Sequence, residues 1–137
     1  MLFSKKEDYN ENSYLIKIAA LLIHAAKIDE KYSIEEELII KKTLLDLGAD
    51  KVNLDALMNN AKKKEEKSNQ ILDFTKQIKG MNDKEKIKII KSLWKIIYSN
   101  KNADMYETNL MRRLSGLLYI DSKIMGDIKE EIKKESL

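Results

Sequence analysis

The chain has 137 residues, of which 36% are charged, and its formal net charge at pH 7 is only +3. It contains no proline, four glycines and no cysteine, so little in it interrupts a helix, and disulfides and thiolate metal sites are excluded. The composition therefore predicts one all-α domain with a hydrophobic core, and the lack of cysteine favours a cytoplasmic protein.

The longest apolar run covers residues 18–26, with His24 inside it. This is about half of the roughly 20 residues that a membrane-spanning helix requires, so we expect no transmembrane segment. The first residues turn polar at once, unlike the basic and then apolar order of a signal peptide. We expect a flexible tail over residues 1–12, followed by a helical domain over residues 13–137.

Apolar residues at three- and four-residue steps predict a first helix over about residues 12–28. A second helix is expected to begin at Ile34, because Ser33 and Glu36 have the spacing of a capping box. It should end at Gly48, since glycine tolerates the left-handed conformation that follows many helices. Its apolar pattern is carried by Leu38, Ile39, Leu44, Leu45 and Leu47.

The same reasoning predicts five further helices. A third follows a cap at Asp50 or Asn53 and extends to about Lys67, and a fourth covers residues 70–79. The fifth is capped by Asp83, the sixth follows a second capping box at Asp104 and Glu107, and the seventh starts at Asp121. The lysines of the fifth helix are expected to lie largely on its outer face: Lys84, Lys86, Lys88, Lys91 and Lys95.

The two halves of the chain share a pattern at a spacing of 71 residues. Ile16, Lys17, Ile18, Leu22, Glu36, Leu47 and Asp50 recur as Ile87, Lys88, Ile89, Leu93, Glu107, Leu118 and Asp121. A repeated pattern of this kind indicates a duplicated structural unit. We therefore predict a single-domain bundle of seven helices, in which residues 14–61 and 85–132 are related by a pseudo-two-fold axis.

The residues around the two predicted interhelical loops resemble the TerB family. That family combines an apolar helix ending in Ala-x-Ala-Asp-Gly with a glutamate seven residues after the aspartate. Residues 25–29 with Glu36 match the pattern once, and Asn100 with Glu107 matches it again, although Glu30 and Lys101 replace the usual glycine. The resemblance covers about residues 14–125. It implies a small helical protein of tellurite-resistance and stress-response systems, related to the N-terminal domain of DjlA-type co-chaperones and without a settled enzymatic activity.

Acidic and amide side chains near these loops form a candidate site for a divalent cation such as calcium or magnesium, which prefer oxygen ligands. The candidate ligands are Asp29, Glu36, Asn100, Asp104 and Glu107. The spacing of Ser33 with Glu36, and of Asp104 with Glu107, is equally that of helix caps. Because Asn100 carries no charge, capping is the interpretation that we favour.

The sequence does not indicate an enzyme. His24 is the only histidine, and it lies in an apolar helix, so we interpret it as a structural residue. The chain has neither a Gly-x-Ser-x-Gly elbow nor a glycine-rich phosphate loop.

Three functions remain open at this stage. The one favoured is binding of a partner protein, which can be membrane-associated, through the acidic loops, with or without a divalent cation. A second is a co-chaperone-type accessory domain, although the chain lacks the His-Pro-Asp triplet of a J domain. A third is electrostatic binding of anionic membrane or nucleic acid through the lysine-rich helix over residues 84–95, with nucleic acid the less favoured ligand because the net charge is small.

Overall fold

In the computed structural model, the backbone is described over residues 2–27, 33–68, 72–99 and 105–136. Side chains are described over the same ranges apart from residues 2–13, 72, 77, 105–108 and 136. These ranges contain seven α-helices, one 3-10 helix and no strand, which confirms the predicted all-α class. The helices are α1 (Leu2–Ala26), α2 (Ile34–Asp46), η1 (Lys51–Asn53), α3 (Leu54–Lys67), α4 (Leu72–Lys79), α5 (Asp83–Ser99), α6 (Met105–Leu117) and α7 (Ser122–Ser136).

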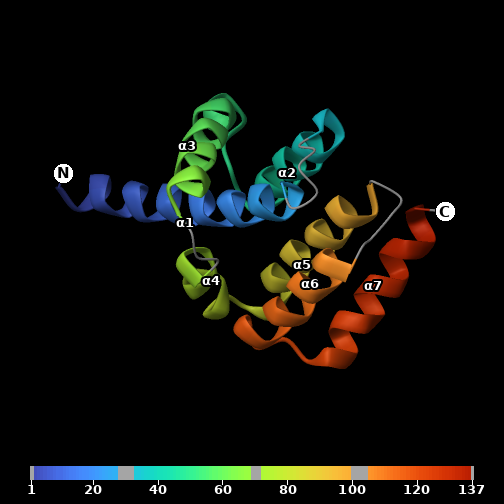
Figure 1. The fold of residues 1–137 in the computed structure, drawn as a ribbon. Helices are drawn as coiled ribbons and strands as arrows, with labels where there is room; N and C mark the ends of the chain where they lie inside the picture. The colour runs from blue at the N-terminus through green and yellow to red at the C-terminus, as the bar shows by residue number, and fades with distance from the viewer. Residues whose placement is uncertain (1, 28–32, 69–71, 100–104, 137) are drawn as a thin grey trace.

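Helix α1 is the element around which the others are arranged. In Figure 1, α2 and α3 lie on one side of α1, and α4 to α7 lie on the other. The largest interfaces join α1 to α3 and α5 to α7, while α2 packs on both α1 and α5. Residues 18–23 of α1 are each at most 1% exposed, as expected of a helix that is apolar on all sides. The core is therefore built on the middle of α1 and completed by Ile89, Ile90 and Leu93 of α5.

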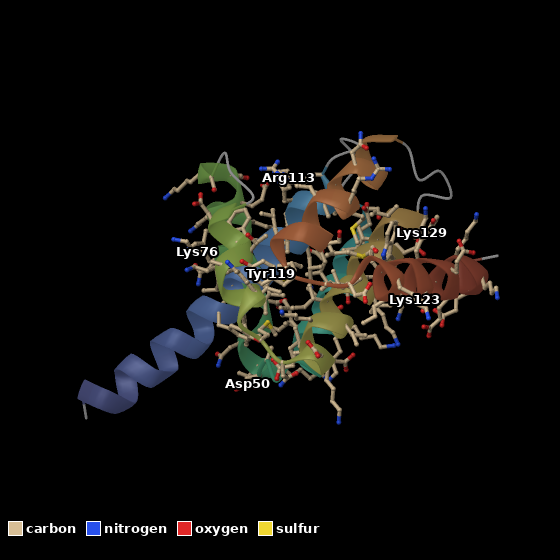
Figure 2. All side chains as sticks on the ribbon, turned by 90° about the horizontal axis from the view of Figure 1, so that it is seen from below. Asp50, Lys76, Arg113, Tyr119, Lys123 and Lys129 are labelled. Carbon is tan, nitrogen blue, oxygen red and sulfur yellow. The ribbon has the colours of Figure 1, made fainter. Side chains whose placement is uncertain are left out.

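The start of α1 differs from the expected position. The helix begins at Leu2 rather than near Asn12, so residues 2–12, predicted to be a tail, continue it. Residues 2–26 include neither proline nor glycine, so nothing in the local sequence ends the helix. Figure 2 shows this N-terminal part of α1 extending beyond the rest of the molecule.

Helix α2 has the caps that the sequence predicted. The amide of Glu36 donates to Ser33 Oγ at 3.1 Å, and the amide of Ser33 donates to Glu36 Oε1 at 2.9 Å. At the other end Gly48 has φ +105°, and the amide of Ala49 donates to the carbonyl of Leu44 at 2.9 Å. These bonds satisfy backbone groups that the helix ends leave unpaired.

Several hydrogen bonds recur at the predicted spacing of 71 residues. Helix α6 has the bounds of α2 shifted by 71, since 34 and 46 become 105 and 117. Asp50 accepts from the amide of Val52 at 3.0 Å, and Asp121 accepts from the amide of Lys123 at 2.9 Å. The packing of these two helices differs, because α2 lies on α5 whereas α6 contacts α4. Duplication of the whole unit therefore stays a prediction.

One residue of the second half departs from its counterpart in a way that affects stability. Tyr119 occupies the position of Gly48 after α6 and has φ +55°, a conformation that costs a side-chain-bearing residue energy. Its ring is 70% exposed and lies under the ammonium group of Lys79, with 4.4 Å between Nζ and the ring centroid.

Candidate functional site

Glu36 is the one predicted cation ligand whose side chain is described, and it serves as a helix cap. The residue is 1% exposed, and its Oε1 accepts the amide of Ser33. Asp29, Asn100 and Asp104 lie outside the described residues, as does the side chain of Glu107 in α6. Within the described part of the chain, no group of three or more histidine, cysteine, aspartate or glutamate side chains is placed to hold a metal. The capping prediction is confirmed at Glu36, and the cation site stays a prediction.

His24 belongs to a charged cluster that joins α1 to α3. Its Nδ1 lies 3.4 Å from Glu65 Oε1, and Lys27 Nζ lies 2.9 Å from Glu65 Oε2. Glu65 is 9% exposed, so two cationic or polar partners stabilise an otherwise costly buried carboxylate. The half-buried His24 thus has a structural partner.

Lys86 is buried, although the lysines of the fifth helix were expected to lie largely on its outer face. It is 7% exposed, and its Nζ donates to the carbonyl of Leu118 at 3.0 Å, just after α6. A cation is favourable at the C-terminal end of a helix, where carbonyl groups lack partners. Lys84, Lys88 and Lys95 are exposed as predicted, while Lys91 is half-buried.

Tyr14 forms a half-buried link between α1 and α5. Its hydroxyl donates to Glu85 Oε2 at 2.8 Å. Burial raises the pKa of the Tyr14 hydroxyl above its ordinary value, and the hydrogen bond and the negative charge of Glu85 raise it further.

The outer face of α2 carries three large apolar side chains that are exposed in the described part of the chain. Ile34, Leu38 and Leu45 are 79%, 60% and 38% exposed. Steps of four and seven residues place them along one line of the helix, which we call the α2 stripe. The opposite face of α2 is buried in the core through Ile40 and Leu44. The apolar pattern of the sequence did not separate these two faces, because α2 has aliphatic residues on both.

Charged residues border the α2 stripe, and most of those on one side are paired. Glu37 Oε1 lies 2.7 Å from Lys62 Nζ, and Lys41 Nζ lies 3.4 Å from Asp55 Oδ1, so both pairs join α2 to α3. On the other side Glu35 is exposed. Thr43 and Ser92 are within hydrogen-bond distance across the buried α2–α5 contact. The stripe is thus presented on a helix that is held to both α3 and α5.

A basic groove lies beside this helix, between α2 and α5. The volume of the groove is about 220 Å³. Its charged lining consists of four lysines and one carboxylate: Lys42, Lys88, Lys91, Lys95 and Asp46. Lys91 Nζ also lies 3.6 Å from Glu131 of α7, and Lys88 Nζ lies 3.5 Å from the carbonyl of Asp46. The groove therefore keeps an excess of positive charge.

The fold and these surfaces describe an all-α module that presents an apolar stripe and a basic groove. Comparison with protein families gives a match to the family described as tellurite resistance protein TerB, over residues 15–130. The chain belongs to the TerB family, and it is therefore a module of the tellurite-resistance-associated class. Comparisons with curated proteins and with solved structures gave no match. None of the helices in the described ranges is long and apolar enough to cross a membrane.

Proposed function

We propose that the chain is a cytoplasmic, non-enzymatic TerB module of a stress-response system, and that it binds a partner protein through the α2 stripe. The observation that carries the proposal is the exposure of Ile34, Leu38 and Leu45 on a helix whose other face is anchored in the core. Isolated exposed apolar residues are common on proteins, but aligned large ones mark interaction surfaces.

The energetics of burial support this choice of surface. Fully burying one leucine or isoleucine side chain stabilises a complex by about 1.5–3 kcal/mol. Ile34 and Leu38, with 79% and 60% of their surface exposed, have most of this contribution still to gain. Two such residues on a rigid helix form the centre of an interface, where a few side chains supply most of the binding energy.

The charges near the α2 stripe indicate the chemistry of the partner. Asp29 and Glu30 shortly precede Ile34 in the sequence, and Glu35 is exposed beside it. A partner with lysine or arginine would match the Ile34 end of the stripe, whereas the exposed Lys42 favours an acidic group near Leu45. The proposal does not require a divalent cation, and calorimetric titration with calcium tests separately the alternative that Asp29 and Glu36 bind one.

Photo-cross-linking tests the proposed surface. A photoreactive amino acid replaces Leu38 in one variant and Val52 in another, since Val52 is 88% exposed but lies in η1, outside the stripe. In cells of the source organism, we expect a discrete adduct with a second protein from position 38 and none from position 52. Equal adducts from both positions, or only an adduct of the chain with itself, would contradict the proposal.

The basic groove favours a second candidate function, the binding of anionic membrane. Its four lysines can neutralise lipid headgroups at the cost of little rearrangement, because Lys42, Lys88 and Lys95 are exposed. Sedimentation with vesicles that contain anionic lipid tests it. Binding at physiological salt that is lost when Lys88 and Lys95 become glutamine would favour this function, and binding confined to low salt would rule it out.

A further inference from the structure

A surface pocket that the proposed function does not use lies among α5, α6 and α7. Its volume is about 220 Å³, and Trp94 of α5 contributes to its lining, so we call it the Trp94 pocket. Figure 2 labels Lys129 of α7, one of the residues that line the pocket. Arg112 and Ser115 of α6 line another part.

The charged side chains that line the Trp94 pocket are both cations. Arg112 and Lys129 bring positive charge, and the described lining residues include no carboxylate. Trp94 is 2% exposed, and its Nε1 has no hydrogen-bond partner among the described residues. An indole N–H can only donate, and leaving it unpaired in the interior is costly. The net charge of the described lining is therefore positive.

The remaining surface of the Trp94 pocket is apolar. Met111 and Met125 line it together with the indole ring, and methionine side chains adapt readily to aromatic and aliphatic ligands. Gly126 leaves open space, because a Cβ atom at that position would have no neighbour within 4 Å. For comparison, a cavity of about 150 Å³ is enough to hold benzene.

We propose that the Trp94 pocket binds a small organic anion, with an aromatic or short aliphatic body and a single carboxylate. The body lies against Met111, Met125 and the indole ring. The carboxylate pairs with Arg112 and Lys129. Lys129 is already near this position, since its Nζ lies 5.5 Å from the centroid of the Trp94 ring.

Trp94 fluorescence provides a direct test, because Trp94 is the only tryptophan of the chain. We expect sodium phenylacetate, added to the full chain, to change this fluorescence in a saturable way. Phenylacetamide has nearly the same shape without the charge and should bind at least about tenfold more weakly, since charged hydrogen bonds are stronger than neutral ones. No saturable change up to about 10 mM phenylacetate, or equal binding of both compounds, would overturn the proposal.

Matched variants locate the binding in the pocket. Arg112→Gln and Lys129→Gln should each weaken phenylacetate binding about tenfold, whereas Lys123→Gln, on the same helix as Lys129 but outside the pocket lining, should leave it unchanged. Gly126→Leu should abolish binding by filling the space, and Gly116→Leu serves as its control on α6. Circular dichroism checks that each variant folds, and if Gly126→Leu does not fold, the comparison of the three charge variants decides. Equal effects of Lys123→Gln and Lys129→Gln, or wild-type affinity in a folded Gly126→Leu variant, would overturn the assignment.

Discussion

Replacement of Glu36 separates its role as a helix cap from a role as a cation ligand. Glu36→Ala removes the acceptor of the Ser33 amide and leaves that N–H unpaired beside a buried site, because Glu36 is only 1% exposed. An unsatisfied buried donor costs about 1–3 kcal/mol, so we expect a loss of about 2 kcal/mol in the free energy of unfolding. Glu36→Gln keeps an amide oxygen that can accept the same bond, and it should cost less than about 1 kcal/mol.

Thermal unfolding converts these energies into measurable shifts. Unfolding entropies of about 2.1 cal/mol/K per residue give roughly 290 cal/mol/K for 137 residues, or about 3.5 °C per kcal/mol. Glu36→Ala should therefore lower Tm by about 7 °C, and Ser33→Ala, which removes the reciprocal bond at 3.1 Å, by about 3–4 °C. Calcium should leave the wild-type Tm unchanged, since only a ligand of the folded state raises it. The reasoning would be refuted if Glu36→Gln were as costly as Glu36→Ala and calcium stabilised the wild type alone.

Three further changes test the account of stability. Tyr119→Gly should raise the free energy of unfolding by about 0.5–1 kcal/mol, because it relieves the φ of +55° and loses only an exposed contact with Lys79. Urea unfolding measures this change, and destabilisation of the variant would contradict the expectation. Gly126→Ala should stabilise α7 by about 0.5–1 kcal/mol in the same assay, since the added methyl group meets no neighbour, and no gain would show that Gly126 is needed for another reason. Because the pKa of Tyr14 is raised in the folded state, its contribution to stability is complete below pH 10 and is lost as the pH rises above this value. When tyrosinate absorbance is followed against pH, Tyr14→Phe should lack the phase that titrates at the highest pH. An unchanged titration would refute the effect.

The local features of the sequence predicted most of the helices well. The capping box at Ser33 and Glu36 and the stop at Gly48 define α2 in the structure as they did in the sequence. Such signals involve backbone groups within a few residues, so no knowledge of the tertiary structure is needed to interpret them. The start of α1 was wrong by ten residues, because a polar segment without a stop signal gave no evidence of where the helix begins.

The surfaces could not be predicted in the same way. Leu38 and Leu45 belong to an apolar pattern that surrounds α2, and only the packing of α2 on α1 and α5 determines which residues are exposed. The burial of Lys86 depends on the carbonyl of Leu118, which is 32 residues away in the sequence. The Trp94 pocket likewise requires three helices to come together. Each of these features depends on tertiary contacts that hydrophobic periodicity does not contain.

The affinity of the chain for the protein cross-linked at position 38 tests the proposed function most directly. Isothermal titration calorimetry would compare the wild type with Leu38→Asp, which places a charge on the α2 stripe, and with Val52→Asp, which places the same charge on an exposed residue of η1. If the α2 stripe is the interface, Leu38→Asp should weaken binding at least about tenfold, because the charge would have to be buried, and Val52→Asp should bind as the wild type does. Equal affinities for all three proteins would contradict the proposed function.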